Sequence, residues 1–513
     1  MTVQASSGNN KRIAKNTLLL YFRMIFMMAV SLYTSRVVLN TLGVEDFGIY
    51  NVIGGVVAMF SVISGGLSAA ISRYITFELG QGNTAKLKSV FSSSVTIQIG
   101  LALLIFVLAE IGGVWFLNEK MNLPESRIGA ANWVLQCSIL TFMVNLISVP
   151  YNAAIIAHER MQAFAYISII EVVLKLLIVY ILVIFSFDKL KLYGILLLAV
   201  ACVIRIAYGI YCKRNFKECT YHFTFNKALL KEMMGFAGWN FIGNCASILS
   251  TQGVNILLNI FFGPTVNAAR GVAVQVQNAV LQFSQNFQTA LNPQITKNYA
   301  KGDREAMYKL IIRSSRFSFF LLFFLSLPIF LMTQEVLELW LKRVPDYSAV
   351  FLKISLMIVT VDAMVNPLMV AATATGHVRH YQTIVGGVVM LITPVAYVAL
   401  KLGAAPPAVF VVHFIVCVVA AIARIYILKS LIGLSVRNYM TQVGKNLLMV
   451  ILVGVPLPLS LYYFVTPDNF LRMVSLGVVC MLSVAMAVYS VGMDVNEKKF
   501  VTDQFVKKFN CKK

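Results

Sequence analysis

ISRYITFELGQGNTAKLKSVFSSS, at residues 71–94, returns 220 residues later as LNPQITKNYAKGDREAMYKLIIRSS, at residues 291–315. The constant offset pairs Ile75 with Ile295, Gly82 with Gly302, Asn83 with Asp303 and Ser94 with Ser314. Each stretch reads as the end of one apolar helix, a glycine turn and the start of the next helix. A repeat at one long, fixed offset indicates two copies of the same structural unit, and this decides the fold.

The composition around the repeat is that of an all-α integral membrane protein. Of the 513 residues, 59% are hydrophobic and only 12% are charged, against about 25% charged in soluble domains. Runs of about 20 apolar residues can cross a bilayer. The sequence predicts fourteen such spans, at 17–40, 48–71, 89–117, 128–150, 163–187, 192–212, 233–261, 266–290, 314–333, 349–373, 382–400, 407–428, 446–465 and 471–491. The span at 266–290 is the least apolar of them.

The positions of the cations predict the orientation of the chain. An even number of spans places both termini on one side, and 28 of the 43 Lys and Arg residues lie in loops on that side. Cytoplasmic loops carry the excess of positive charge, so both termini are expected in the cytoplasm. The net charge of +22 therefore lines the cytoplasmic face, and no nucleic-acid partner is expected.

The sequence lacks the residues that several classes of protein need for their function. The eight cysteines form no CxxC pair and read as free thiols, so neither a disulfide framework nor a metal site is expected. There is no GxxxxGK[ST] loop for ATP, and we expect no cofactor. No loop exceeds about twenty residues, too few for a soluble catalytic domain. The sequence thus predicts a protein that is not an enzyme.

The repeat also predicts the domain organisation. An even number of helices per copy gives both copies the same orientation, as in transporters built from parallel repeats. We expect a first lobe of six helices at 1–212, a cytoplasmic linker at 213–231, a second lobe of six helices at 232–430, and two further helices with a cytoplasmic tail at 431–513. Two such lobes around a midplane site describe an alternating-access transporter.

Three motifs carry a resemblance to a known family: TLGVEDFGIYNV (41–52), ITFELGQGNTAKLKSVF (75–91) and ITKNYAKGDREAMYKLI (295–311). With them the chain resembles bacterial polysaccharide (O-antigen type) flippases of the multidrug/oligosaccharidyl-lipid/polysaccharide exporter superfamily. The resemblance implies a V-shaped, MATE-like fold in the bacterial inner membrane, with a cation-lined cavity. It implies that the substrate is an undecaprenyl-pyrophosphate-linked oligosaccharide for O-antigen or capsule assembly. Membrane lipids and other polysaccharide-assembly proteins are the implied partners.

The stretch ARGVAVQVQNAVLQFSQNFQ (269–288) holds seven side-chain amides in an apolar setting. On a helical wheel five of them share an arc of about 100°: Gln275, Asn278, Gln282, Gln285 and Asn286. Such a face at bilayer depth must meet water or protein, as a cavity wall that binds sugar hydroxyls or as a contact between helices. The first copy of the repeat, at 49–68, has one amide, which favours the cavity wall.

Four cations inside predicted spans are candidates for binding the pyrophosphate headgroup: Arg23, Lys175, Arg205 and Arg270. Charges at bilayer depth are costly, and guanidinium binds phosphate oxygens bidentately. Arg23 lies near enough to a helix end to snorkel instead. Lys175 follows Glu171 by four residues, so the two could form an internal ion pair.

Carboxylates inside predicted spans are candidates for coupling transport to H⁺ or Na⁺, namely Asp362 and Glu171. Asp362 could instead be a buried partner for Lys353 or for an arginine of another helix. Pro367 follows in the same span and should leave a backbone carbonyl without its helical partner.

Two rival functions make different demands on the sequence. A multidrug exporter of the same superfamily predicts twelve helices and an apolar or acidic cavity, whereas this chain has a surplus of intramembrane arginine. A membrane glycosyltransferase or polymerase predicts a large outer loop with essential acids, which the sequence lacks. The sequence leaves open the sugar composition, the coupling ion and the oligomeric state.

Overall fold

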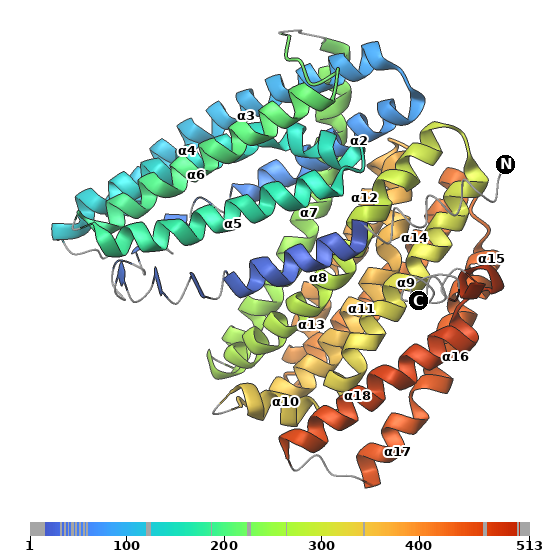
Figure 1. Ribbon diagram of the computed structural model, residues 1–513. Coiled ribbons are helices and arrows are strands. Elements are labelled where there is room, and N and C mark those ends of the chain that lie inside the picture. Colours follow the sequence, from blue (N-terminus) through green and yellow to red (C-terminus); the bar gives the residue numbers. More distant parts are fainter. Residues whose placement is uncertain are drawn as a thin grey trace, which may run out of the picture. The chain divides into compact units, whose positions relative to one another are not determined.

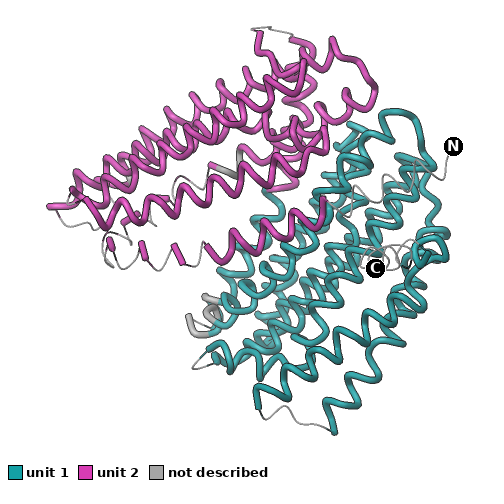
Figure 2. Tube along the Cα trace, viewed as in Figure 1, with its two compact units in different colours: residues 1–13, 245–513 teal, residues 14–244 magenta. Residues whose placement is uncertain are grey.

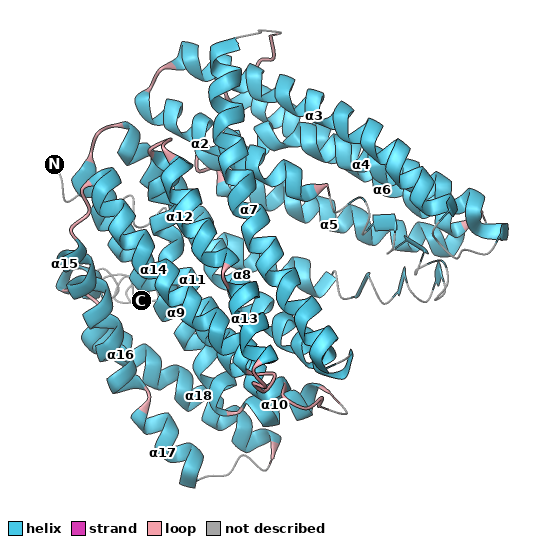
Figure 3. Ribbon diagram, turned by 180° about the vertical axis from the view of Figure 1, so that it is seen from behind, coloured by secondary structure: helices cyan, strands magenta, loops and turns pink. Residues whose placement is uncertain are grey.

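The computed structural model describes residues 16–30, 60–119, 125–185, 187–222, 227–262, 264–341, 344–464 and 469–499, together with Thr502 and isolated positions between 33 and 57. Throughout these residues the regular structure is helical, and they contain no strand (Figure 3). The predicted all-α class is therefore confirmed.

The helices are labelled in Figure 1. Their bounds are Ser61–Gln81 (α2), Thr84–Glu119 (α3), Glu125–Ala157 (α4), Met161–Ile184 (α5), Lys189–Asn215 (α6), Lys227–Phe262 (α7), Pro264–Ala300 (α8), Arg304–Leu331 (α9), Thr333–Trp340 (α10), Ser348–Ala374 (α11), Val378–Met390 (α12), Ile392–Lys401 (α13), Ala408–Ile432 (α14), Val436–Tyr439 (α15), Asn446–Gly454 (α16), Pro456–Phe464 (α17) and Phe470–Ala487 (α18). Two π-helical turns are present: Met440–Lys445 (η1) lies just before the thirteenth predicted span, and Val488–Gly492 (η2) lies at the end of the fourteenth. An unlabelled helix, Asn16–Val30, comes before α2.

Eleven helical stretches among the described residues are long and apolar enough to cross a membrane. They coincide with eleven of the fourteen predicted spans. Three predicted spans remain. Of the span at 17–40 the helix Asn16–Val30 is described, and the span at 48–71 ends in α2. The third, at 266–290, lies in α8, which is too polar to qualify. The total of fourteen stays a prediction. Large apolar side chains such as Phe464 and Leu471, 86% and 79% exposed, suit lipid rather than water.

The chain divides into two compact units, one of residues 14–244 and one of residues 1–13 and 245–513 (Figure 2). The boundary falls inside α7, because the first half of this helix packs on the first unit. There Tyr74 donates a hydrogen bond to Glu232 at 2.9 Å, and its ring meets that of Phe236 edge-on. The last two spans belong to the second unit. The predicted lobe limits at residues 212 and 232 stay a prediction.

The two copies of the repeat adopt the same local geometry. Gly82 ends α2 and Gly302 follows α8, each in the left-handed region, at φ 74° and 77°. The next residues, Asn83 and Asp303, each accept a hydrogen bond from the backbone N–H three residues on, at 3.0 Å in both cases. A side-chain cap satisfies an otherwise unpaired N–H at a helix start. The 220-residue repeat of the sequence is therefore also a repeat of structure.

The first half of the predicted linker packs against the unit of residues 14–244. The Phe216 ring stacks on His158 with centroids 4.0 Å apart, and the His158 ring shares a hydrogen bond with Glu218. The His222 N–H donates to Ser92 Oγ at 3.3 Å. Burial raises the pKa of the Glu218 carboxyl, but the bond to His158 and the charge of Lys88 outweigh it, so this pKa lies below its ordinary value.

A group of ion pairs at the opposite end of the same unit explains Asp46, one of the two acidic residues of the motif at 41–52. Arg127 at the start of α4 donates Nε to Asp46 Oδ1 at 2.8 Å and also bonds Asp46 Oδ2. Its Nη1 donates to Asp188 Oδ2 at 3.2 Å. Asp188 in turn caps α6 by accepting from the N–H of Leu190 at 3.1 Å. One guanidinium thus ties three successive loops of this unit, and such bidentate pairs are the stronger class of ion pair.

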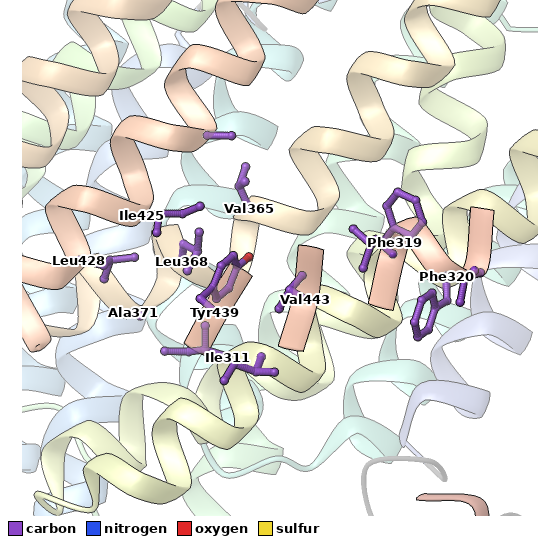
Figure 4. Packing of buried hydrophobic residues seen from close by; sticks show 14 of the residues in the cluster. Ile311, Phe319, Phe320, Val365, Leu368, Ala371, Ile425, Leu428, Tyr439 and Val443 are labelled. Carbon is purple, nitrogen blue, oxygen red and sulfur yellow. The ribbon is translucent and has the colours of Figure 1, made fainter. Parts of the chain in front are cut away.

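The core of the second unit joins the last two spans to the repeat helices. Figure 4 shows Leu368 of α11 beside Tyr439 of α15, with Val443 of η1 next to Tyr439 and with Phe319 and Phe320 of α9 further along. All five lie in one cluster of buried apolar residues. Apolar burial of this kind fixes α9 against both the repeat and the last two spans.

We expect Gly82→Ala to destabilise the protein by roughly 1 kcal/mol, because a Cβ in the left-handed region is strained although nothing lies within 4 Å of it. The control is Gly100→Ala in α3, where the space is equally open and the backbone is helical. It should be neutral or stabilising by up to about 1 kcal/mol. Thermal unfolding in detergent measures both, and equal effects of the two substitutions would contradict the repeat geometry.

Candidate functional site

The predicted headgroup cations of the unit of residues 14–244 lie in two places. Arg23, on the helix Asn16–Val30, donates to Ser168 Oγ of α5 at 3.3 Å and stacks over Phe164 at 4.4 Å. Glu171, one turn further along α5, interacts electrostatically with Arg23 and bonds Lys175 at 2.6 Å. The structure thus brings Arg23, Glu171 and Lys175 together as a cluster with one surplus positive charge.

The ion pair between Glu171 and Lys175 is the internal pair that the spacing allows. Its side chains are 34% and 45% exposed, so the pair lies at the surface of α5 rather than in its packed side. A surface pair of this kind contributes little to stability. Lys175 is therefore paired and also accessible to a ligand.

Arg205 lies apart from this cluster, on α6. Its guanidinium covers the Tyr151 ring of α4, 3.9 Å from the centroid. Its Nε has no hydrogen-bond partner among the described residues. This Nε is itself buried, while the side chain as a whole is half-buried.

The amide face predicted on α8 is largely exposed. Gln275, Asn278, Gln282 and Gln285 are all exposed along one side of the helix. Asn286 differs, since it is only 9% exposed and donates to the Gln282 carbonyl at 2.9 Å. Four of the five predicted amides are thus accessible and one is turned into the helix packing. Of the corresponding first copy, the single amide Asn51 lies outside the described residues.

Arg270 anchors the start of this helix to α7. Its Nη1 donates to Asn255 Oδ1 at 3.2 Å and its Nη2 to the Thr251 carbonyl at 2.9 Å. The side chain is half-buried and interacts electrostatically with His413 of α14. Both hydrogen-bond acceptors are neutral, so they orient the guanidinium without neutralising its charge.

Gln288 is an amide that the wheel left outside the predicted face, and it lies in the helix packing. It is 2% exposed and donates to Ser318 Oγ of α9 at 2.9 Å and to the Ala363 carbonyl of α11 at 2.8 Å. Its Oε1 accepts from Asn366. Pro367 cannot bond to Ala363, four residues before it, so Gln288 satisfies the carbonyl that the proline leaves open. The freed carbonyl is confirmed, and Pro367 itself was the signal that could have led to Gln288.

Asp362, the other coupling candidate, lies in α11 and interacts with the charge of Arg424 in α14. Arg424 also donates Nε to Tyr381 of α12 at 3.2 Å. Its Nη1 is buried and has no hydrogen-bond partner among the described residues. Of the two partners considered for Asp362, the structure favours an arginine of another helix, since Lys353 lies over the Phe330 ring.

The predicted site residues therefore fall into separate sets within the two units. Arg23, Lys175 and Arg205 belong to residues 14–244, whereas Arg270 and the amide face belong to residues 245–513. Asp362 and Arg424, which interact electrostatically without a direct ion-pair contact, both lie in the second unit. Among the described residues no group of His, Cys, Asp and Glu could hold a metal ion, and the seven cysteines described are free.

Comparison with solved structures shows which class of protein has this fold. The chain superimposes on the bent form of the Vibrio cholerae MATE transporter VcmN with a TM-score of 0.68 and 16% identity, over 85% of this chain and 99% of that one. A MOP superfamily transporter from Pyrococcus furiosus, whose binding pocket is described as having reverse polarity, gives 0.63 and 15% over 83% and 96%. The protein is thus a multi-pass membrane protein with a MATE-like transporter fold.

The family follows from the sequence. Residues 13–299, more than half of the chain, match the family described as polysaccharide biosynthesis protein. The chain belongs to this family. A relative, the uncharacterized membrane protein EpsK of Bacillus subtilis (strain 168), is 23% identical over 336 residues. That match spans 63% of this chain and slightly under two thirds, 64%, of EpsK.

We expect Gln288→Leu to lower the free energy of unfolding by between about 0.6 and 3 kcal/mol, because it leaves the Ala363 carbonyl unpaired in a buried place. The matched control is Gln275→Leu, one of the exposed amides, which should change stability by less than about 0.5 kcal/mol. Thermal unfolding of the purified protein compares them. Equal melting temperatures would show that the Gln288 bonds do not hold α8, α9 and α11 together.

Proposed function

We propose that the protein is a flippase that moves undecaprenyl-pyrophosphate-linked oligosaccharide across the bacterial inner membrane by alternating access, for assembly of a surface polysaccharide. The observation that carries the proposal is the exposed amide face of α8. Four neutral amides project from a helix of bilayer length in a transporter fold. An amide both donates and accepts hydrogen bonds, which suits the many hydroxyls of a sugar. Family membership in polysaccharide biosynthesis supports the same substrate class.

The cations inside the predicted spans would bind the pyrophosphate headgroup of such a substrate. A pyrophosphate headgroup is multiply negative and needs donors that stay charged inside the membrane. We assign this role to Arg23, Lys175, Arg205 and Arg270. The described hydrogen bonds and ring contacts of Arg205 and Arg270 are to neutral groups, so their charges remain available to a phosphate.

Energy for transport comes, in this proposal, from an H⁺ or Na⁺ gradient acting on Asp362 or Glu171. Each carboxylate has a cation beside it, Arg424 for Asp362 and Lys175 for Glu171. A coupling ion that binds the carboxylate would compete with that cation. Such competition changes the charge balance of a helix pair, which is how ion binding biases a two-state transporter.

The cellular setting follows from the same substrate. Undecaprenyl-linked intermediates are made at the cytoplasmic leaflet, so we place the protein in the bacterial inner membrane with both termini in the cytoplasm. Membrane lipids surround it, and other polysaccharide-assembly proteins would receive its product. No part of this proposal requires a cofactor.

A second candidate function is an ion-coupled multidrug exporter. The likeness to MATE transporters favours it, because the fold accommodates both functions. The unneutralised cations count against it, since cationic drugs would be repelled by them. The two functions make opposite predictions for the arginine variants below.

We expect Arg270→Ala and Arg205→Ala each to abolish surface polysaccharide while leaving the protein level in the membrane unchanged. The reason is that a phosphate loses its bidentate partner. Lipid-linked oligosaccharide should then accumulate on the cytoplasmic side, as it should in a deletion strain. Mass spectrometry of extracted lipid-linked oligosaccharide measures this and also identifies the sugars.

The matched control is Arg379→Ala, which removes an exposed arginine from the first turn of α12, outside the predicted site. It should export normally. Normal export by both Arg270→Ala and Arg205→Ala would refute the headgroup role. Retained export with altered drug sensitivity would favour the exporter.

The amide face makes a separate prediction. In a background without native cysteines, Gln275→Cys, Asn278→Cys, Gln282→Cys and Gln285→Cys should react with a membrane-impermeant thiol reagent, and oligosaccharide substrate should slow the reaction. Gln288→Cys is the control, because its position is 2% exposed and should not react. Reaction confined to the Val and Leu positions of α8 would contradict the cavity wall.

A further inference from the structure

Arg316, in the first half of α9, is among the largest fully buried side chains of the described structure. It is 2% exposed. Its Nη1 and Nη2 donate to the two carboxylate oxygens of Asp494 at 3.2 and 3.1 Å, and Nη2 also lies 2.8 Å from both oxygens of Glu497. The two carboxylates come from the segment that follows the last predicted span.

A second arginine completes the charge balance. Arg313, one turn before Arg316, places Nε 3.3 Å from Glu497 Oε1. Two arginines therefore face two carboxylates, and the cluster is neutral. The Asp494 N–H also donates to Glu497 Oε2 at 3.0 Å, which fixes the two carboxylates relative to each other.

The chain reaches this position through the π-helical turn η2. Gly492, the last residue of η2, lies where a Cβ would come within 3.0 Å of Phe320 and Val450. The close approach lets the segment with Asp494 come directly onto α9. A π-turn changes the direction of the residues after it, and such turns often mark functional positions.

Another side of α9 holds the amide-bearing helix. Ser318, two residues after Arg316, accepts the hydrogen bond of Gln288 from α8. Residues two apart on a helix point in different directions, so the contact with the C-terminal carboxylates and the contact with α8 use different faces of α9. The helix is thereby fixed at adjacent positions by two unrelated parts of the chain.

We propose that Asp494 and Glu497 form an ionic latch on Arg316 that sets the position of α9, and through Ser318 and Gln288 the position of the amide-bearing α8. Opening the latch frees the C-terminal segment and lets α9 shift, which changes the exposure of the amide face. The latch is accessible to solvent, because Asp494 is 64% exposed while Arg316 is covered. With the termini in the cytoplasm, as proposed above, it faces that side. Its release is a means of regulating transport from the cytoplasmic side, whatever the substrate is.

The test opens the latch by substituting Asp494 and Glu497, which lie outside the predicted membrane spans. In the full-length protein, Asp494→Asn with Glu497→Gln leaves Arg316 buried and unpaired, which should lower Tm by roughly 5 °C or more. Thiol labelling of Gln282→Cys on α8 should change by about threefold or more, the scale of coupling through packed networks. Hydrogen exchange in residues 488–499 should accelerate. The single substitution Asp494→Glu keeps the charge, so Tm, thiol labelling and hydrogen exchange should all stay at the wild-type values.

A third substitution separates a latch from simple charge compensation. Adding Arg316→Met to the two neutral substitutions removes the fully buried charge, so Tm should recover in large part, although Arg313 still lacks Glu497. If the latch positions α8, the labelling of Gln282→Cys stays altered in this variant. Recovery of both Tm and labelling to wild-type values would overturn the proposal.

The matched control is the pair of Lys309 and Glu305, on the same helix but exposed by 74% and 80%. Lys309→Met with Glu305→Gln should change Tm by less than about 1 °C, since exposed pairs contribute little. It should also leave labelling at residue 282 unchanged. An effect equal to that of the latch variants would overturn the proposal, because any loss of charge on α9 would then suffice. None of these measurements depends on the identity of the transported substrate.

Discussion

The need to satisfy every backbone polar group inside a bilayer is the constraint on which the second unit depends. Pro367 breaks the bonding pattern of α11, and Gln288 of α8 replaces the missing donor at 2.8 Å from the Ala363 carbonyl. The same side chain bonds Ser318 of α9. One amide therefore fixes three helices that pack against one another, and the exposed amides of α8 are presented from this fixed position.

Charge balance separates the structural ions from those available to a ligand. Arg313 and Arg316 are matched by Asp494 and Glu497, so this group is neutral, and Asp362 interacts electrostatically with Arg424. By contrast, Arg23, Glu171 and Lys175 leave one positive charge. An unmatched cation in a membrane protein is retained against its desolvation cost. The surplus is the feature that our proposal of an anionic substrate headgroup would account for.

Much of the fold could be predicted from the sequence, because its determinants are local. Gly82 and Gly302 specify the same turn through their backbone freedom, and the matches around them at one constant offset show the repeat. The site was predicted less completely. A helical wheel groups residues by angle on one helix, so it placed Asn286 with the exposed amides and Gln288 outside them. Which face is buried depends on α9 and α11, and no periodicity within α8 contains that information.

Arg316 is a charged residue whose burial could likewise not be predicted from the sequence. Counting cations by loop assigned it to the cytoplasmic surface, which orients the chain but does not distinguish a solvated arginine from a buried one. Its partners lie at Asp494 and Glu497, at the far end of the sequence. A buried arginine and its distant carboxylates must be retained together, because either one alone leaves an uncompensated charge. The last two spans are therefore bound to the repeat by specific charges as well as by apolar contact, and this makes their position on α9 a defined one.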